Sequence, residues 1–268
     1  MRMSDEPKSD PDAMLLRKDE GGITTLMLNR PDARNALSRA MIAAIQKELD
    51  TIADDPSVRT VVFAANGTAF CAGHDMRELV TNKSPVFYDE LFHACGRMMT
   101  SIMNLPQPVI ARVQGVATAA GCQLVATCDL AVAAESAQFA TPGVHIGLFC
   151  STPMVALGRN VGRKQAMEML ILGDPLSAQR AVDYGLINKV VPTEKLDDAI
   201  GDITAKILDK SGYTIKVGKE AFYRQLECGV EEAYAYTAKV MAENMMSHDA
   251  QEGVGAFVDK RKPVWRGE

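Results

Sequence analysis

Short apolar runs alternate with amphipathic segments over the first two thirds of the chain. The runs at 23–29, Thr60–Ala65 and 108–115 have the length and the apolar, β-branched content of buried strands. Between the first two runs, apolar residues recur at steps of three and four from 37 to 49, which predicts a helix with one buried face. This alternation predicts an α/β architecture in which helices cross between strands.

A second amphipathic helix is predicted over Pro85–Asn104, where methionines recur on the apolar face. Such methionines can line a flexible acyl pocket, but a methionine stripe at helical spacing is more often ordinary core. Further short strands are predicted at 129–134, 138–140 and 186–191.

The strand signal stops after Glu194, and the rest of the chain predicts helices only. These helices are expected at 196–208, 213–226, 231–246 and 250–262. Residues 1–12 are mostly polar and include two prolines, so we expect a disordered lead-in there. The predicted organisation is therefore a lead-in at 1–12, an α/β core at 13–193 and a helical region at 194–268.

Composition narrows the class of protein. The chain has 268 residues, of which 47% are hydrophobic and 24% charged, an ordinary balance for a globular protein. Its formal net charge of −5 gives no basic excess to neutralise phosphates, so we do not expect a nucleic-acid partner. No apolar run approaches the roughly 20 residues of a membrane span, and the polar N-terminus lacks a secretory signal. The expected location is cytoplasmic, with no membrane partner.

The six cysteines are scattered and show no paired metal-ligand spacing. Most of them stand among small or apolar residues, where a free thiol behaves as a small hydrophobe. The sequence therefore predicts no metal site and no structural disulfide. Cys150 is singled out because it falls near the predicted pocket described below.

Two segments combine a strand ending with small residues and a helix beginning. One runs from 69 to 79 and contains Ala72, Gly73 and His74; the other passes from the strand ending at Gly115 to the helix predicted at 119–126. The first N–H groups of a helix lack partners within it and attract negative charge. Two such junctions can aim one N–H each at a single carbonyl oxygen. A tight loop between strand and helix explains the first glycine equally well.

The motifs in this chain resemble those of the crotonase (enoyl-CoA hydratase/isomerase) superfamily over about 14–266. The resemblance is carried by Leu-Asn-Arg-Pro at 28–31, Asn-Ala-Leu at 35–37, Ala-Phe-Cys-Ala-Gly-His-Asp at 69–75, the segment 115–129, Ala-Gln at 178–179 and Gly-Leu-Ile at 185–187. It implies a crotonase-like spiral of repeated ββα units. It also implies that the helical C-terminal region serves oligomerisation, as a homo-oligomer that is a trimer or a dimer of trimers.

The resemblance also implies a site for an acyl-CoA or enoyl-CoA thioester, with coenzyme A entering as part of the substrate and no separate cofactor. Matched residue by residue, the two oxyanion-hole N–H groups are those of His74 and Ala120. The positions that meet coenzyme A in the family are Ala33, Arg34, Ala36, Ala72, Asp75, Met76, Phe257 and Lys260. The last two would reach the ligand from a neighbouring subunit. A basic segment at 260–262 is equally explained as a solvated helix end.

The pattern of a hydratase breaks at the acid and base. The family places one water between two glutamates, and the matching positions here hold Gln123 and Gly143. Neither residue can accept a proton from water, and such groups commonly supply ~10² to 10⁴ in rate. His145 lies two positions past Gly143, so in an extended segment it would point the same way, although a hydrogen-bonded or surface histidine is the more common explanation. The His74 ring is a further candidate, although a ring that the loop simply tolerates explains it more readily. Cys150, Ser151 and Tyr88 are weaker substitutes, since no activating base is identifiable for them.

Three functions remain open on the sequence. The first is an enzyme of the enoyl-CoA hydratase or isomerase type, a lyase or isomerase of acyl groups that stabilises a thioester enolate with non-glutamate groups. The second is a noncatalytic acyl-CoA binding protein that has lost hydratase activity. The third is a structural or regulatory oligomer with a vestigial pocket, which the intact oxyanion and coenzyme A segments disfavour.

Overall fold

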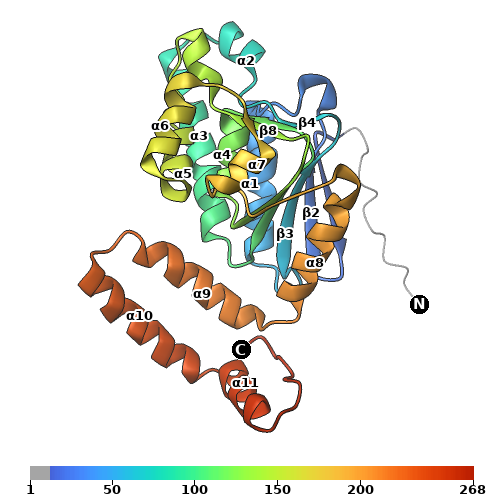
Figure 1. The fold of residues 1–268 in the computed structure, drawn as a ribbon, viewed down its shortest axis with the longest axis vertical. Coiled ribbons are helices and arrows are strands. Elements are labelled where there is room, and N and C mark those ends of the chain that lie inside the picture. Colours follow the sequence, from blue (N-terminus) through green and yellow to red (C-terminus); the bar gives the residue numbers. More distant parts are fainter. Residues whose placement is uncertain (1–12) are drawn as a thin grey trace.

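A computed structural model describes residues 13–268, and the lead-in expected at 1–12 lies outside the described residues. The fold is built on two sheets with helices packed on and between them, and a group of C-terminal helices extends from one end (Figure 1). This arrangement is the α/β class that the alternating pattern predicts.

The larger sheet has six strands in the order β1-β2-β3-β5-β7-β10. Its strands are β1 (Leu15–Glu20), β2 (Ile23–Leu28), β3 (Thr60–Ala65), β5 (Val109–Val113), β7 (Leu130–Ala134) and β10 (Lys189–Val191). Only β1 and β2 pair antiparallel, through a two-residue turn at Gly21 and Gly22 where both φ angles are positive. The remaining neighbours are parallel, and β3 is buried at every position, as expected for a strand covered on both faces.

The smaller sheet has four strands in the order β4-β6-β8-β9. Its members are β4 (Ala69–Cys71), β6 (Val116–Thr118), β8 (Gln138–Ala140) and β9 (Leu176–Ser177). The first three are parallel and β9 is antiparallel to β8. Because β4 and β6 are parallel neighbours, their carboxyl ends meet at the same edge.

The two sheets are built from a repeating unit. Each of β3, β5 and β7 belongs to the larger sheet and is followed by β4, β6 or β8 in the smaller sheet, after which the chain enters helical structure. The spiral of ββα units is thereby confirmed. The helices that follow these strands are α2 (Met76–Thr81), α3 (Pro85–Asn104), α4 (Ala120–Thr127), α5 (Pro153–Asn160), α6 (Arg163–Leu172) and α7 (Ala178–Asp183).

The main core lies between the larger sheet and a layer that includes α1 (Arg39–Ala53), α3 and α4. The two long helices each begin at a serine whose hydroxyl accepts a backbone N–H, Ser38 for α1 and Ser84 for α3. The apolar stripe predicted for α1 is buried from Met41 to Ile52. The methionines Met98 and Met99 of α3 are buried in the core cluster, in agreement with the ordinary-core reading of that stripe.

The opposite face of the larger sheet is covered by α8 (Leu196–Leu208). Its residues Leu196, Ala199 and Ile200 form a second apolar cluster with side chains of β3, β5 and β7. The three helices that follow, α9 (Gly212–Gln225), α10 (Val230–Met245) and α11 (His248–Val258), extend beyond the sheets (Figure 1). Helix α10 buries none of its side chains. No helix within residues 13–268 has both the length and the apolar content to cross a membrane.

Several elements differ from the sequence-based expectation. The segment 186–191 forms a strand only at Lys189–Val191, because the N–H groups of Leu186 and Ile187 bond to the Ala181 carbonyl oxygen of α7 and their side chains bury in the core. The short strands β4, β6 and β9 have two or three residues each, too few for a periodic signal. The four C-terminal helices lie where they were expected, within a few residues at their ends.

One buried polar cluster fastens α9 to the core. The Asp129 carboxylate accepts hydrogen bonds from Lys219 Nζ at 2.6 Å, from Tyr223 Oη at 2.8 Å and from the backbone N–H of Val109 at 2.7 Å. Lys219 Nζ also donates to two backbone carbonyl oxygens, at 3.1 and 3.0 Å. The Lys219 side chain is only 7% exposed, and this burial lowers its pKa despite the opposing effect of Asp129.

Replacing Lys219 with methionine should strongly destabilise the fold. The substitution preserves the apolar stem but leaves Asp129 buried without its counter-charge, a change that typically costs about 3–5 kcal/mol. Lys216→Met, at an exposed position on the same helix, is the matched control and should leave the free energy of unfolding nearly unchanged. Urea denaturation of both variants measures the difference; equal stabilities would show that the cluster does not hold α9.

Candidate functional site

The two strand-to-helix junctions lie against each other at one edge of the smaller sheet. A Cβ atom placed on Gly73 would lie 2.8 Å from the Ala119 Cβ and 3.3 Å from the Ala120 backbone nitrogen. The Thr118 hydroxyl donates to the Ala72 carbonyl oxygen at 3.1 Å and ties the junctions together. A side chain at position 73 would therefore separate the two segments, which explains the need for glycine in chemical terms.

The His74 peptide is held by a neighbouring segment. The N–H of Leu37 donates to the Gly73 carbonyl oxygen at 2.7 Å, and the N–H of Asp75 donates to the Leu37 carbonyl oxygen at 3.3 Å. The N–H of His74 itself has no acceptor within residues 13–268. His74 precedes α2, whose N-cap is Asp75, so its N–H is oriented by this local pairing and not by a helix N-terminus.

Ala120 is the first residue of α4, and its N–H likewise has no acceptor in the described chain. The preceding residue, Ala119, has φ +50° and ψ −119°, a conformation that costs a non-glycine residue of order 1–3 kcal/mol. The surrounding structure holds it there through a 2.9 Å hydrogen bond from the Ala119 N–H to the Ala140 carbonyl oxygen. The structure thus brings together the two segments that carry the predicted oxyanion donors, with the residue before His74 next to the Ala120 nitrogen.

Two buried polar atoms near these junctions have no hydrogen-bond partner in the described chain, His74 Nε2 and Gln123 Oε1. The Gln123 side chain lies one turn into α4 and the residue is only 4% exposed. The His74 ring meets the Phe92 ring edge to face at 5.3 Å. Burial lowers the pKa of His74 to about 4, so its imidazole is neutral at physiological pH.

Gly143 does not lie in an extended segment, so the geometry expected for His145 is wrong. Residues Pro142–Ile146 form a 3₁₀ helix, which replaces the two-residue repeat of a strand with a three-residue repeat. His145 is exposed, and its Nε2 would lie 2.9 Å from a Cβ placed on Gly173 at the end of α6. The loop then folds back, so that a Cβ on Gly143 would lie 2.1 Å from the Leu148 carbonyl oxygen.

The other substitute acids and bases are engaged or buried. Tyr88 donates its hydroxyl to the Leu79 carbonyl oxygen at 3.0 Å, and the exposed Ser151 donates its hydroxyl to the Phe149 carbonyl oxygen at 3.4 Å. Cys150 is buried with its Sγ 2.9 Å from the position of a Gly143 Cβ, and burial raises the pKa of its thiol. All six cysteines are free, and residues 13–268 hold no group of three or more metal-ligating side chains.

The loop that contains the residues matched to coenzyme A is hydrogen-bonded to the oxyanion segment. The N–H of Ala72 donates to the Arg34 carbonyl oxygen at 3.0 Å. Asp75 caps α2 and pairs with Arg30 at 3.1 Å; burial opposes ionisation, but these hydrogen bonds outweigh it and lower the pKa of the carboxyl. Arg34 and Met76 are exposed, whereas Ala33 is half-buried and Ala36 is buried.

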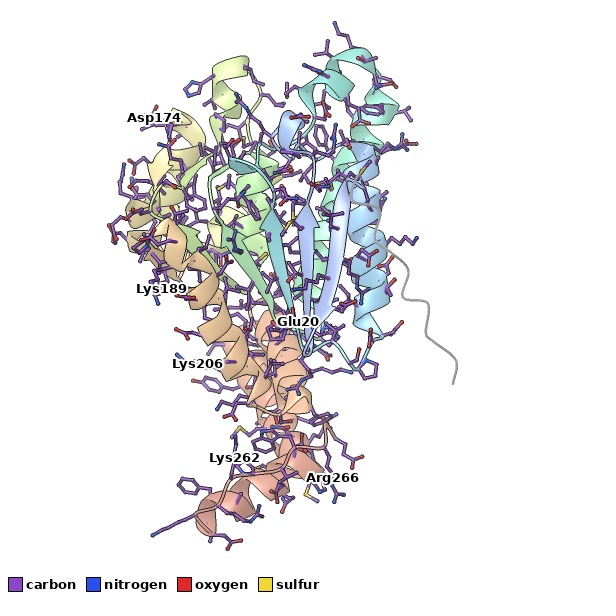
Figure 2. The ribbon with its side chains drawn as sticks, turned by 90° about the vertical axis from the view of Figure 1, so that its right-hand side faces the viewer. Glu20, Asp174, Lys189, Lys206, Lys262 and Arg266 are labelled. Atoms are coloured by element: carbon purple, nitrogen blue, oxygen red, sulfur yellow. The ribbon has the colours of Figure 1, made fainter. Side chains whose placement is uncertain are left out.

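Phe257 and Lys260 are not brought to this site within one chain. Phe257 is 85% exposed on α11 and Lys260 follows that helix with φ +57°. Helix α11 lies at the far end of the molecule from α2 (Figure 1), and Figure 2 places the neighbouring Lys262 and Arg266 at that same end. Within one chain these two positions therefore lie far from the oxyanion segment.

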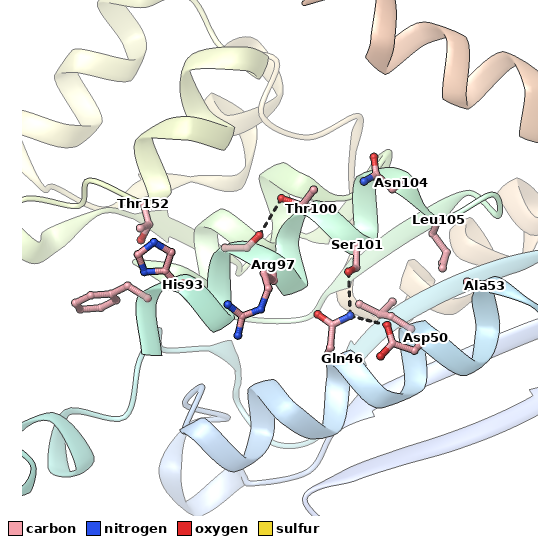
Figure 3. Close-up of a pocket in the computed structure, with 13 residues that line it drawn as sticks. Gln46, Asp50, Ala53, His93, Arg97, Thr100, Ser101, Asn104, Leu105 and Thr152 are labelled. Carbon is pink, nitrogen blue, oxygen red and sulfur yellow. Dashed lines mark hydrogen bonds between the residues drawn. The ribbon is translucent and has the colours of Figure 1, made fainter. Parts of the chain in front are cut away.

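A groove between α1 and α3 lies apart from the predicted residues. It is lined by polar side chains including Gln46, Asp50, His93 and Arg97, and Gln46 donates to Asp50 at 2.7 Å and to Ser101 at 2.9 Å (Figure 3). One wall is Phe92, whose ring reaches His74. The groove therefore flanks the His74 ring without containing any of the predicted site residues.

Comparison with known proteins identifies the family. Residues 18–268 match the family model described as enoyl-CoA hydratase/isomerase. A relative from Xenopus laevis, "Enoyl-CoA hydratase domain-containing protein 3, mitochondrial", is 49% identical over 92% of this chain and 84% of its own length. The human protein of the same name is 46% identical over 92% of this chain and 82% of its own.

Solved structures agree with these matches. An enoyl-CoA hydratase from Mycobacterium smegmatis superposes with a TM-score of 0.93 and 54% identity, covering 94% of this chain and 99% of its own. The human enoyl coenzyme A hydratase domain-containing protein 3 gives a TM-score of 0.92 and 45% identity, covering 94% and 100%. The resemblance drawn from the motifs is thereby confirmed.

The same relatives correct one expectation. The cytoplasmic location inferred from the polar N-terminus is wrong, because relatives that are 44–49% identical to this chain carry the word mitochondrial in their names. A polar N-terminal stretch does not specify a compartment. From the family model, the relatives and the fold together, this chain belongs to the enoyl-CoA hydratase/isomerase family.

Proposed function

We propose that this chain binds the coenzyme A thioester of an acyl or enoyl group and stabilises its enolate between the N–H groups of His74 and Ala120. The observation that supports this most is that both N–H groups lack acceptors and lie on segments in van der Waals contact. Hydrogen-bond donors fixed before the reaction favour charge that develops on a carbonyl oxygen. An enolate of a thioester carries its charge on that oxygen.

The reaction proposed is proton transfer next to the thioester carbonyl, with isomerisation as the net outcome for an enoyl substrate, and not efficient hydration. Gln123 is well placed to orient a polar group but cannot take its proton. Gly143 offers no side chain, and the Leu148 carbonyl oxygen occupies the space where one would begin. The neutral His74 ring is a weak base because burial lowers its pKa, so proton transfer through it would be slow.

A noncatalytic acyl-CoA binding protein is the second candidate. It is favoured by the absence of a carboxylate at positions 123 and 143, where a hydratase of this family carries its acid and base. A binding protein would use the same two N–H groups as the enzyme, because they can also bind the thioester carbonyl of an unreacted ligand. Only a chemical readout separates the two.

Deuterium incorporation from heavy water provides that readout. Wild-type protein is incubated with saturated and enoyl-CoA esters of increasing chain length, and the esters are analysed by mass spectrometry. Exchange at the α-carbon, or movement of the double bond, is the expected result; addition of water would show hydration. Saturable binding without any incorporation would favour the noncatalytic candidate.

A paired variant tests whether the Ala120 N–H carries that activity. Proline at the first helical position keeps α4 but removes the N–H, and glycine at 119 lets the residue before proline retain its positive φ. Ala119→Gly/Ala120→Pro should lose about 10²–10³-fold in exchange rate relative to Ala119→Gly alone. Equal rates in two folded proteins would exclude Ala120 as a donor.

The two missing glutamates should not behave alike when restored. Gln123→Glu is nearly isosteric and should raise hydration of crotonyl-CoA measurably above the wild-type level. Gly143→Glu must displace the Leu148 carbonyl oxygen, and such overpacking typically costs about 1–3 kcal/mol of stability. Hydration assays with melting curves test both; full stability of Gly143→Glu would contradict the packing argument.

We also propose a homo-oligomer, a trimer or dimer of trimers. Exposed apolar side chains gather on the tail helices at Phe222, Leu226, Tyr234, Met241 and Phe257, and isolated chains rarely leave so many uncovered. Tyr234→Glu/Met241→Glu should dissociate the assembly in analytical ultracentrifugation, because both charges would be buried. Lys239→Glu, on the same helix, is the control; a wild-type monomer would refute the proposal.

A further inference from the structure

The segment 30–37 is bonded directly to the peptide that carries the His74 N–H. Three backbone hydrogen bonds join them: Leu37 N–H to the Gly73 carbonyl oxygen at 2.7 Å, Asp75 N–H to the Leu37 carbonyl oxygen at 3.3 Å, and Ala72 N–H to the Arg34 carbonyl oxygen at 3.0 Å. In a trans peptide the C=O and the N–H point in opposite directions. By holding the Gly73 carbonyl oxygen, Leu37 therefore sets the direction of the His74 N–H on the other side of the same peptide plane.

The segment is itself held in a costly shape. Arg34 and Asn35 are consecutive non-glycine residues with φ angles of +50° and +55°. Such left-handed residues persist only when their surroundings impose the conformation. Asparagine tolerates the left-handed region better than most residues, because its short polar side chain can hydrogen-bond locally. Arg34 has no such short polar group.

The side chain of Asn35 supplies the constraint. It is fully buried, and its Oδ1 accepts the backbone N–H of Arg30 at 2.8 Å. Its Nδ2 donates to the carbonyl oxygens of Asn66 and Ala69, both at 2.8 Å. One amide thus spans the start of the segment and the two ends of the turn that leads into β4.

The side chain of Arg30, the first residue of the segment, reaches across to its last residues. Its guanidinium donates to the Ala36 carbonyl oxygen at 3.0 Å and to Asp75 at 3.1 Å. The outer side of the segment, including Asp32 and Arg34, is exposed. A ligand that touches this outer side would touch a loop whose inner side orients the His74 peptide.

We propose that Asn35 is a positioning residue: it holds the segment 30–37 so that the His74 N–H points at the thioester carbonyl before the nucleotide end of coenzyme A is bound. The inference rests on the proposed function. Coenzyme A bound to the outer side of the segment would reinforce the same arrangement. Without the Asn35 side chain, the orientation of the His74 N–H depends on nucleotide binding. Part of the nucleotide's binding free energy is then offset by the cost of ordering the segment.

Kinetics with two substrates test this role. Asn35→Gly deletes all three side-chain hydrogen bonds but permits the positive φ. With a pantetheine thioester, which lacks the nucleotide, kcat for α-deuterium exchange should fall ~10²-fold, as expected for one lost donor. With the matching coenzyme A thioester, kcat should fall only about 10-fold, because binding of the nucleotide restores the alignment. The KM for this ester should rise.

Asn82→Gly, an equivalent deletion at the exposed end of α2, should leave both substrates unaffected. Equal losses for the two esters would indicate only a reduced folded fraction and would overturn the positioning role. A rise in KM for the coenzyme A ester alone would also overturn it, because it would make Asn35 a contributor to nucleotide binding only. If Asn35→Gly does not fold, Arg30→Met removes the guanidinium bonds and is expected to give the same pattern in weaker form.

Hydrogen exchange of the protein separates this inference from the proposed function. The amides of Ala72 and Asp75 are bonded to the segment and should exchange faster in Asn35→Gly than in wild type, with protection restored by added coenzyme A. Unchanged exchange at both amides would refute the coupling even in an active enzyme. If wild type shows no substrate chemistry, the proposed enzymatic function fails while this measurement still decides the coupling.

Discussion

The contact between the β4–α2 and β6–α4 junctions is the constraint on which the site depends. It requires backbone to approach backbone more closely than side chains allow. A Cβ on Gly121 would lie 2.1 Å from the Cys71 carbonyl oxygen, and one on Gly115 would lie 2.0 Å from that of Thr68. With Gly73, these glycines let two neighbouring strands deliver their ends to one point. Parallel pairing of β4 and β6 then directs both chains toward the same edge.

The buried side of this contact carries neutral groups, and the nearest ion pair, Arg30 with Asp75, lies beside it. The core beneath it is apolar, and the polar atoms left without partners, His74 Nε2 and Gln123 Oε1, belong to neutral groups. Neutral donors and acceptors can be buried at far lower cost than carboxylates. Strong acid–base catalysis would require a titratable group that the family pattern supplies and this chain replaces.

The fold was largely predictable because its signals are local and long. The long amphipathic period predicts the helices α1 and α3, and the continuous apolar run predicts the buried strand β3. The error at His145 has a different origin: Pro142–Ile146 is short, and a 3₁₀ turn and a strand of five residues have no distinguishing period. The cytoplasmic prediction failed because compartment is encoded by recognition signals and not by the composition of the folded domain.

The sequence by itself determined the family, the alternation of the long strands and helices, and the two segments whose backbone forms the candidate site, because motif order and hydrophobic period are properties of the chain alone. Tertiary structure alone decided three things. The Leu148 carbonyl oxygen fills the space where a side chain at Gly143 would begin, and His145 is exposed beside Gly173. Asn35 holds a loop whose far end orients the His74 peptide. Each is a contact between residues with no periodic or compositional signature linking them. Such contacts exist only after the strands have paired and brought distant backbone within hydrogen-bond reach.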